Sequence, residues 1–556
     1  MPRALSTSLS LALAALCSAP AVSGQAPDPF HASADDMAWW REARFGMFIH
    51  WGPVSIRGTE ISWSRGGERP GVGGTGQIPL ADYDTLYQRF DPKLFNADEW
   101  VALAKSAGMK YLVFTTKHHD GFSMFNSQYT DFKITNSPFG RDVVRELADA
   151  CHRAGIRLGF YYSPADWHHP DFLTANHSRY VDYFHRQIRE LMRNYGRVDI
   201  LWFDGLSGNA QDYGAEALFP VVRALQPHII INNRCGLPAD FDTPEQTIGT
   251  FQTTRPWESC ITIGDQWAYR PNDNTKSLKQ CIDTLVRCAG GDGNLLLNVG
   301  PTPLGQIEPG QADRLREIGA WLRKYGQTIY GTRGGPFRPG QWGAATCKGN
   351  TVYLHLLSPS APRAELPPLA ARVVSCRVVT GGAARFRQSD EGLVVQVRKQ
   401  DMQDLDTIVA LRLDRPASDV PVPRVPSRSV AYGKPATASN VFQNMPVYGP
   451  PAALDDNPDT RWATDQGVHQ AWLEVDLGKE CEIGKAFISE AFDRVQSWEL
   501  QFGEGDAWRT FYKGERIGTD CQVSFQPVKA KGVRLNILQA TEGPTIWELQ
   551  LLPPQK

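Results

Sequence analysis

The feature that most constrains the fold is an alternation of two hydrophobic patterns between about residues 36 and 330. Short, continuous apolar runs recur there, and amphipathic stretches with helical spacing lie between them. The apolar runs are at 47–51, 111–115, 158–163, 200–204, 229–232 and 295–299, with a weaker one at 260–263. The helical stretches are at 98–107, 141–154, 180–195, 215–225, 278–288 and 312–325.

Strand and helix units that repeat over about 300 residues predict an α/β fold with a parallel sheet, and this length fits a (β/α)8-like TIM barrel. A doubly wound open sheet is the competing architecture. The sequence has no Gly-rich phosphate loop after the first predicted strand, which favours the barrel.

The helical pattern ends after residue 331, and the rest of the chain predicts two all-β units. Short alternating runs at 351–357, 371–379 and 392–397 predict a β-sandwich over 336–416. The Pro- and Ser-containing stretch 417–428 predicts a linker, and a second β-sandwich is expected over 429–556. The barrel is expected over 26–335.

Residues 1–25 predict a cleavable signal peptide, with a charge at Arg3, an apolar run at 9–16 and small residues before residue 25. No later segment has the about 18 consecutive apolar residues of a membrane span. We therefore expect a secreted or periplasmic protein without membrane insertion. The 58 basic and 60 acidic residues nearly cancel, which gives no reason to expect a nucleic acid partner.

The cysteines predict up to two local disulfides in an oxidising compartment, Cys347 with Cys376 and Cys481 with Cys521. The sequence contains no CxxC or HExxH spacing, so a catalytic zinc is not expected.

Polar and aromatic residues follow most of the predicted strands. They are His50 after the first strand, His118 and His119 after the second, Tyr161 and Tyr162 in the third, Trp202 and Asp204 in the fourth, and Arg234 beyond the fifth. The C-terminal ends of barrel strands converge on one pocket, and stability alone does not require such residues there. Rings together with many hydrogen-bonding groups suit a polyhydroxylated sugar ring.

Hydrolysis of a glycosidic bond requires two carboxyl groups. In a retaining enzyme they lie roughly 5–5.5 Å apart, one acting as nucleophile and the other as acid and then base. Asp204, at the end of a buried strand, suits the nucleophile, although a strand-end Asp can also simply cap a helix. Glu245 and Glu258 both lie in predicted loops further along the chain. Glu258 follows Trp257, and burial beside an indole raises a carboxyl pKa, as an acid catalyst requires.

Four longer motifs resemble those of the α-L-fucosidases of glycoside hydrolase family 29. They are FGMFIHWG at 45–52, TKHHDGF at 116–122, WFDG at 202–205 and NLLLNVGP at 294–301. The resemblance covers about residues 36–335. It implies a (β/α)8-like barrel followed by a β-sandwich, and a retaining double displacement with no metal or organic cofactor for catalysis.

The resemblance also implies roles for individual residues. Asp204 matches the nucleophile, and residues 240–246 resemble the loop that carries the acid/base, so Glu245 is preferred and Glu258 is the alternative. The residues that match sugar contacts are His50, His118, His119, Trp202, Arg234 and one of Tyr161 and Tyr162. Many members carry a Glu-Trp pair after the first strand; here Trp63 is kept, and Glu60 is the candidate for the displaced Glu. Trp257 is a further candidate for substrate contact.

Residues 429–553 resemble the discoidin, or coagulation-factor type C, domain, which includes the family-32 carbohydrate-binding modules. The motifs are AALDDNPDTRW at 452–462 and WLEVDLG at 472–478. The resemblance implies a jelly-roll fold with a structural calcium ion, for which Asp455, Thr460 and Glu548 are the candidate ligands.

We therefore expect an exo-acting α-L-fucosidase that removes terminal fucose from oligosaccharides or glycoconjugates. Two alternatives remain open at this stage. One is a catalytically silent, lectin-like protein that binds fucose or galactose, although a pure binder needs no pair of carboxylates. The other is a retaining glycosidase for a related sugar such as α-L-galactose.

Overall fold

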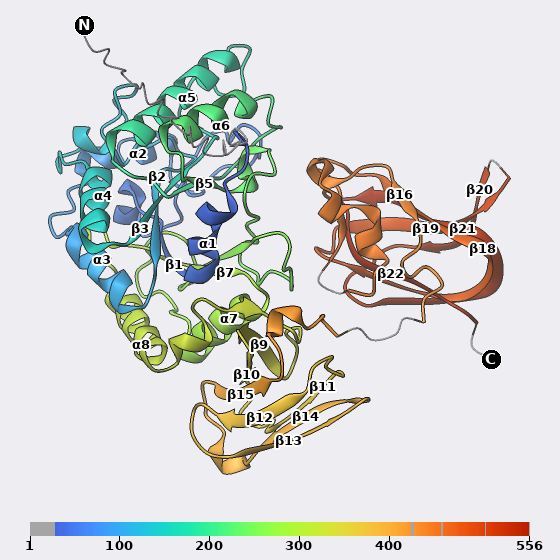
Figure 1. Cartoon of the computed structure of the whole chain (residues 1–556). Helices are drawn as coiled ribbons and strands as arrows, with labels where there is room; N and C mark the ends of the chain where they lie inside the picture. The colour runs from blue at the N-terminus through green and yellow to red at the C-terminus, as the bar shows by residue number, and fades with distance from the viewer. Residues whose placement is uncertain (1–27, 424–427, 458–459, 506, 555–556) are drawn as a thin grey trace, which may run out of the picture.

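A computed structural model of the chain describes residues 28–423, 428–457, 460–505 and 507–554 (Figure 1). The predicted signal peptide lies outside the described residues, as does 424–427 of the predicted linker. In the described part, no helix is both long enough and apolar enough to span a bilayer.

The first part of the chain forms a curled parallel sheet, which confirms the predicted barrel-like α/β architecture. Its strands are β1 (Phe45–Ile49), β2 (Tyr111–Lys117), β3 (Arg157–Tyr162), β4 (Ile200–Phe203), β5 (Ile230–Ile231), β6 (Glu258–Thr262) and β7 (Asn294–Val299). Their order is β5-β4-β3-β2-β1-β7-β6, and all of these pairs are parallel.

Helices cover the outside of this sheet (Figure 1). They are α3 (Ala97–Ser106), α4 (Val143–Ala154), α5 (His177–Asn194), α6 (Ala215–Leu225), α7 (Leu278–Gly290) and α8 (Pro309–Tyr325). Helix α1 (Ala34–Ala43) instead packs against the inner residues of the sheet, and the short α2 (Leu80–Asp84) lies in the connection between β1 and β2. Local chemistry sets several of their ends. Asp142 caps the start of α4 by accepting from the Arg145 amide, and Gly155 ends it with a left-handed φ of 70°.

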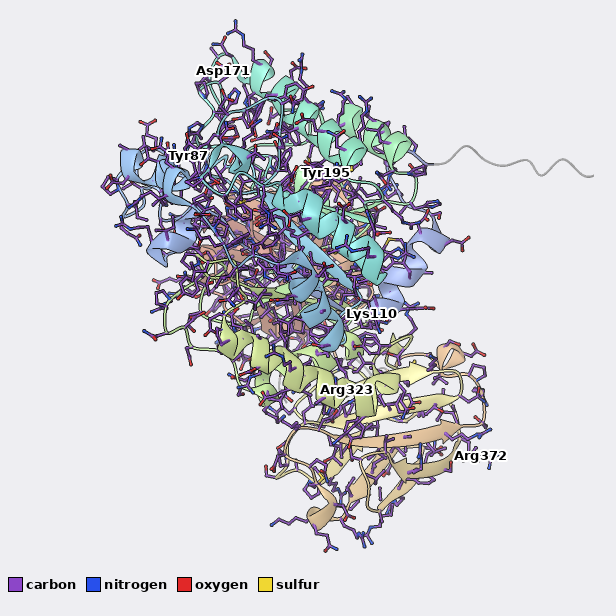
Figure 2. The ribbon with its side chains drawn as sticks, turned by 90° about the vertical axis from the view of Figure 1, so that its left-hand side faces the viewer. Tyr87, Lys110, Asp171, Tyr195, Arg323 and Arg372 are labelled. Carbon is purple, nitrogen blue, oxygen red and sulfur yellow. The ribbon has the colours of Figure 1, made fainter. Side chains whose placement is uncertain are left out.

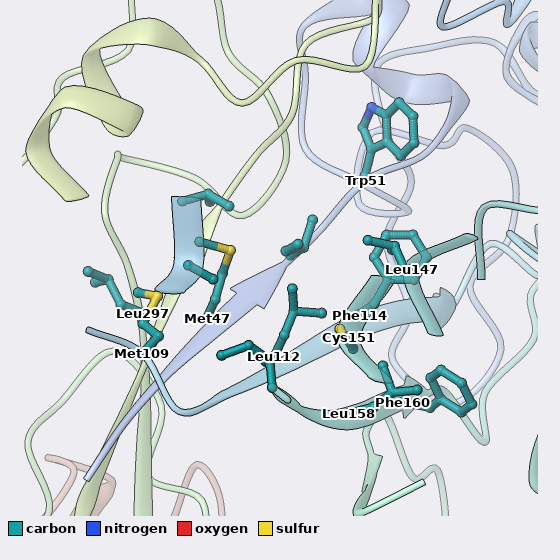
Figure 3. Packing of buried hydrophobic residues seen from close by; sticks show 14 of the residues in the cluster. Met47, Trp51, Met109, Leu112, Phe114, Leu147, Cys151, Leu158, Phe160 and Leu297 are labelled. Atoms are coloured by element: carbon teal, nitrogen blue, oxygen red, sulfur yellow. The ribbon is translucent and has the colours of Figure 1, made fainter. Parts of the chain in front are cut away.

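The main core lies between the sheet and these helices. Figure 3 shows part of it, with Met47 of β1, Leu112 of β2, Leu158 of β3 and Leu297 of β7. The carboxyl ends of the strands point away from the β-sandwich. In Figure 2, Lys110, which precedes β2, and Arg323 of α8 lie toward the sandwich, whereas Asp171, which follows β3, lies at the opposite end.

The sheet is not closed by a regular ladder between β5 and β6. Residues 237–257, which we call the seam segment, fill this gap through isolated parallel bridges from Asn232 to Phe241, Asp242 to Trp257, and Glu245 to Cys260. The segment contains three prolines, at 238, 244 and 256, which lack the N–H that a strand ladder needs. The described sheet therefore has seven strands, where a complete barrel of this type has eight.

The β-sandwich follows α8. Its strands are β8 (Arg333–Gly334), β9 (Gly343–Lys348), β10 (Thr351–Leu356), β11 (Arg363–Leu366), β12 (Val373–Val378), β13 (Ala384–Ser389), β14 (Gly392–Val397) and β15 (Thr407–Leu413). They form one sheet in the order β12-β15-β10-β9-β8 and a second in the order β11-β14-β13, with a separate apolar core between them.

The C-terminal β domain is an antiparallel sheet structure, as predicted. Its strands are β16 (Ala436–Ala438), β17 (Trp462–Ala463), β18 (Ala471–Glu490), β19 (Val495–Glu504), β20 (Ala507–Gly514), β21 (Cys521–Ala540) and β22 (Thr545–Leu552). The main order is β17-β22-β18-β21-β19-β20, and β16 pairs with β18. This domain has its own core. Short 3-10 turns, among them η9 (Pro446–Tyr448), lie on its side nearest the barrel (Figure 1).

The two predicted disulfides are not present, and all nine described cysteines are free. Cys347 lies on β9 and Cys376 on β12, and two strands separate these in the sheet order, about 14 Å at the usual spacing. Cys481 pairs in register with Ala530, far along β21 from Cys521. Neither pair can approach the Cα separation of a disulfide, which is below about 7 Å.

Candidate active site

The strands bring a set of polar and aromatic side chains to one end of the sheet. Asp204 stands just beyond β4, and its amide donates to the Tyr162 carbonyl at 3.3 Å, which continues the parallel ladder. Gly205 follows with φ of 77°, and a Cβ there would lie 2.4 Å from the His119 ring. Only glycine therefore allows the chain to turn so close to this histidine.

Asp204 is held as a carboxylate by two hydrogen-bond donors, Tyr161 and Arg234, and His119 lies beside it. The Tyr161 hydroxyl donates to Oδ2 at 2.9 Å, Arg234 Nη1 donates to Oδ1 at 2.7 Å, and His119 Nε2 lies 3.8 Å from Oδ2. Burial raises the pKa of Asp204, but the charge of Arg234 and the hydrogen bonds from Arg234 and Tyr161 outweigh it, and the pKa falls below its usual value. An ionised, rigidly held carboxylate is what a nucleophile requires.

Arg234 joins this carboxylate to a second one. The same nitrogen, Nη1, donates to Glu245 Oε2 at 2.7 Å. Thr243 holds the guanidinium from the other side, since Nε donates to its Oγ1 at 2.7 Å and Nη2 to its carbonyl at 2.8 Å. The guanidinium also lies over the Trp202 ring, 4.8 Å from the centroid. The seam segment therefore places Glu245 beside Asp204.

Burial keeps the histidines around Asp204 neutral. It lowers the pKa of His50 and of His119 to about 4, and that of His118 further. His119 Nδ1 lies 2.7 Å from Ser163 Oγ, whose own proton is donated to the Ala165 carbonyl. The proton of neutral His119 is therefore on Nδ1, so Nε2, beside Asp204, can accept a hydrogen bond from a sugar hydroxyl.

Aromatic rings form the floor and rim of the site. Tyr161 stacks on His118 with an interplanar angle of 5° and on Trp202 with an angle of 19°. Trp63 is 41% exposed and meets the rings of His119 and Trp167 edge-on. Flat apolar faces next to polar groups are suited to a pyranose ring, which has both kinds of surface.

Of the two tyrosines left open by the sequence, the structure brings Tyr161 to the site and turns Tyr162 away. The Tyr162 hydroxyl donates to Gln187 of α5 at 2.6 Å, on the helix side of the sheet. Adjacent strand residues point to opposite faces, so the two cannot both face the pocket.

Glu258 and Trp257 do not reach the pocket, contrary to their candidate roles. Glu258 is the first residue of β6 and is fully buried at the opposite end of the barrel, where it accepts from Tyr111 and from Trp202 Nε1. Burial raises its pKa to about 7. Trp257 is 3% exposed, and its indole packs over Gly249 and Gly293, with Nε1 donating to the Gly291 carbonyl. Both residues are parts of the core.

Glu60 binds protein backbone and not an open site. Its carboxylate accepts from the amides of Trp267 and Ala268 at 2.8 and 3.0 Å and from that of Ile61 at 3.0 Å. Burial raises the pKa of this carboxyl group. Its contacts fix the loop that carries Trp267, so Glu60 acts on the site through that loop.

Sequence reasoning missed three neighbours of the site. Asn298 Oδ1 lies 2.7 Å from His50 Nδ1, the Trp267 ring lies 4.8 Å from the His50 ring, and Thr243 holds Arg234. Asn298 is a polar residue inside the apolar run 294–299, and that irregularity is a signal for it. Trp267 comes from a loop with no such pattern.

One group of described residues has the ligand types and spacing of a metal site, namely His118, His119 and Asp204, whose ligand atoms lie within 4.8 Å of one another. The Arg234 guanidinium bonds to the same aspartate. Its positive charge opposes a cation there.

The C-terminal β domain has a second cluster of oxygen ligands. Glu548 is 5% exposed, and among the described residues no side chain donates a hydrogen bond to its carboxylate. Burial, followed by the charges of Asp456 and Asp455, raises its pKa to about 9. Asp455 accepts from Thr460 Oγ1 at 2.8 Å. A buried carboxylate beside two further acidic side chains fits a hard cation with oxygen ligands, such as Ca²⁺.

A barrel in which one arginine bonds to two carboxylates near the strand ends is an arrangement that suits a glycoside hydrolase. Comparison with known proteins supports this class. The model of the family described as "Alpha-L-fucosidase" matches residues 18–327, more than half of the chain. The chain belongs to the α-L-fucosidase family. The model described as "F5/8 type C domain" matches residues 435–549, in agreement with the discoidin-like prediction.

Named relatives agree with this assignment. The human plasma α-L-fucosidase is 30% identical over 375 residues, which are 60% of this chain and 79% of the relative. The structure of α-L-fucosidase isoenzyme 1 from Paenibacillus thiaminolyticus has 37% identity and a TM-score of 0.61, and the match covers 68% of this chain and 99% of that one. A GH29 α-L-fucosidase from Bacteroides thetaiotaomicron, trapped as a covalent intermediate with 2-fluoro-fucosyl fluoride, has 26% identity and a TM-score of 0.61, covering 70% and 98%.

Proposed function

We propose that this chain is a retaining exo-α-L-fucosidase with Asp204 as nucleophile and Glu245 as acid/base. The observation that carries the proposal is the shared nitrogen of Arg234. Both carboxylate oxygens lie 2.7 Å from it, so they are separated by at most twice that distance. Two carboxylates that share one nitrogen in this way lie close together, which agrees with the roughly 5–5.5 Å of retaining enzymes better than with the wider separation, roughly 6.5–9.5 Å, of inverting ones.

In the first step Asp204 attacks the anomeric carbon of the fucose. A bond forms between the carboxylate oxygen and this carbon, and the bond to the leaving oxygen breaks with its electron pair. Glu245 gives its proton to that oxygen, so the aglycone leaves as a neutral alcohol. To carry this proton, Glu245 must separate from Arg234, and its half-exposed position at the rim allows this movement.

In the second step Glu245, now ionised, takes a proton from water, and the water oxygen attacks the anomeric carbon. The ester bond to Asp204 breaks, and fucose leaves with its original anomeric configuration. The covalent intermediate trapped in the Bacteroides relative supports this course for the family.

The neutral histidines and the rings are proposed to recognise the sugar. His119 Nε2 lies 3.8 Å from Asp204 Oδ2, so it can accept a hydrogen bond from a hydroxyl of the sugar that Asp204 attacks. His50, His118, Tyr161 and Trp202 supply the adjoining surface, and Trp63 stands at the entrance. Buried polar groups of this kind discriminate strongly, because a sugar lacking the matching hydroxyl leaves them unpaired.

The test uses 4-nitrophenyl α-L-fucoside and a fucosylated trisaccharide. We expect Asp204→Asn to lower kcat by about 10³-fold or more on both, since the covalent step is lost. Glu245→Gln should lose far more activity on the trisaccharide than on the aryl fucoside, because only the poor leaving group needs the proton, and azide should restore turnover of the aryl substrate.

Glu258→Gln is the matched control for the glutamate variant. It is expected to show no leaving-group dependence and no azide rescue, since Glu258 lies in the core. A fluoro-fucosyl adduct on a side chain other than Asp204 would refute the mechanism. Binding of fucose without turnover by the wild type would favour the lectin-like alternative, and faster hydrolysis of the α-L-galactoside would favour the related-sugar alternative.

We also propose that the C-terminal β domain holds a structural calcium ion through Asp455, Thr460 and Glu548, and that no cofactor takes part in catalysis. The burial of Glu548 beside the carboxylates of Asp455 and Asp456 supports the first proposal. The predicted signal peptide leads us to propose export, which N-terminal sequencing of the secreted protein tests.

A further inference from the structure

The C-terminal β domain contacts the seam segment of the barrel through Tyr448. This residue is the last of η9. Its hydroxyl donates to Asp242 Oδ2 at 2.5 Å, a contact between residues 206 positions apart in the sequence. Asp242 Oδ2 has no other donor among the described residues.

Tyr448 is held in place by its own domain. The Phe442 ring meets it edge-on at a centroid distance of 5.5 Å, and the Arg461 guanidinium lies 5.1 Å from its centroid. Arg461 in turn lies over Trp547, 4.8 Å from the centroid. Burial and then the Asp242 carboxylate raise the pKa of Tyr448, so the hydroxyl stays protonated as a donor. The contact is thus built from a fixed side chain.

Asp242 connects this contact to the candidate acid/base. Its Oδ1 accepts from Asn233 Nδ2 at 3.0 Å and from Arg255 Nη2 at 2.9 Å. Asn233 directly precedes Arg234, and Asp242 directly precedes Thr243, which holds the Arg234 guanidinium. Asp242 therefore fixes the residue before Arg234 and, through the backbone, the residue that holds the Arg234 guanidinium. Asp242 itself is 8% exposed.

We infer that Tyr448 is a positioning residue for the acid/base, so that the C-terminal β domain takes part in catalysis by holding the seam segment. Without the Tyr448 hydroxyl, Oδ2 of the buried Asp242 loses its hydrogen-bond donor. The seam segment, which carries Thr243 and Glu245, then loses one of the contacts that hold it. The inference rests on the proposed function, since Glu245 is the group that is positioned.

The first test compares full-length Tyr448→Phe with the wild type on two substrates. We expect kcat/KM on the fucosylated trisaccharide to fall about five- to tenfold, part of the about 10²–10⁴ that a general acid supplies. On 2-chloro-4-nitrophenyl α-L-fucoside, whose leaving group needs no proton, the loss should stay below about twofold. A general loss of structure would lower both rates equally and would overturn the inference.

Tyr512→Phe is the matched control, because Tyr512 lies on β20 at the far side of the same domain (Figure 1). It should leave both rates unchanged. Glu245→Gln, measured in parallel, separates the two proposals. If it shows the expected leaving-group dependence and Tyr448→Phe does not, only the positioning role fails; if Glu245→Gln shows none, the proposed acid/base fails.

The second test does not require activity. Hydrogen–deuterium exchange of residues 240–246 should be at least about threefold faster in Tyr448→Phe than in the wild type, while exchange in β1 and β2 stays unchanged. Equal exchange in the two proteins would show that the contact does not hold the segment, and would overturn the inference whatever the kinetics.

Discussion

The histidines beside Asp204 are neutral because they are buried, and this lowers the stability of the folded state at acidic pH. The polar and titratable groups that face His50 include Asn298, Asp204, His118 and His119, and their effects do not offset the burial that lowers its pKa to about 4. An unfolded chain binds a proton at each of these histidines below about pH 6.5, whereas the folded chain does so only below about pH 4. The folded state therefore loses stability as the pH falls through this window.

We expect the free energy of unfolding of the wild type to decrease between about pH 6.5 and pH 4, by up to about 3 kcal/mol for His50 alone. His50→Gln should flatten this slope. Glu258, whose pKa rises to about 7, acts in the opposite direction, since its contribution is lost as the pH rises from about 4.5 to 7. Urea unfolding midpoints of both proteins across this range measure the difference; parallel slopes would contradict it.

Individual residues could be predicted where a strand end fixes them, and less well elsewhere. Asp204, Trp202 and Arg234 follow from the rule that strand ends share a pocket. The sequence could not choose between Tyr161 and Tyr162, because helices cover the outer face and both residues are buried. The prediction that Glu258 lies in a loop is wrong, because β6 begins at this residue, two positions before the predicted strand. The Glu258 carboxylate therefore lies inside the barrel.

At the scale of the elements, the alternation of strands and helices was predictable, whereas the break in the sheet was not. β5 has only two residues, and the seam segment replaces a regular strand beyond it. Its three isolated bridges join residues without a repeating pattern, so hydrophobic periodicity gives no signal for them. The segment supplies both Thr243 and Glu245, and its attachment therefore governs the site.

We expect Thr243→Val to lower kcat/KM about tenfold, because the Arg234 Nε donor loses its acceptor and the guanidinium is held less firmly between the two carboxylates. Both substrates should be affected, since Arg234 contacts the nucleophile as well. Thr247→Val, in the same segment but away from Arg234, is the control. Steady-state kinetics on the aryl fucoside and the trisaccharide measure the effect, and equal rates for the two variants would contradict it.

At the scale of the whole molecule, the sequence predicted the three folded parts but not how they touch. Composition and periodicity describe each part separately, while the contact between Tyr448 and Asp242 depends on the packing of distant segments. The two disulfide predictions are wrong for the same reason, because nearness in the sequence does not determine the order of strands in a sheet. The C-terminal β domain also carries the candidate calcium ligands, and the burial of Glu548 beside Asp455 and Asp456 is seen only in the structure.

We expect Ca²⁺ to raise the melting temperature of the C-terminal transition by about 5–10 °C over the value in a chelator, as binding well above Kd would provide. Glu548→Gln should abolish this shift, whereas Glu482→Gln, an exposed residue of β18, should retain it. Differential scanning calorimetry of the full-length protein measures the transition. A shift that persists in Glu548→Gln would place the ion elsewhere.

The gap between β5 and β6 sets the two proposed catalytic carboxylates on different kinds of chain. Asp204, the proposed nucleophile, continues the ladder between β3 and β4 through its amide, so the barrel wall fixes its position. Glu245, the proposed acid/base, lies on the irregular seam segment, where a change in chain length disturbs no regular ladder. We therefore expect the seam segment to tolerate insertions and deletions that the strand ends around the sugar would not.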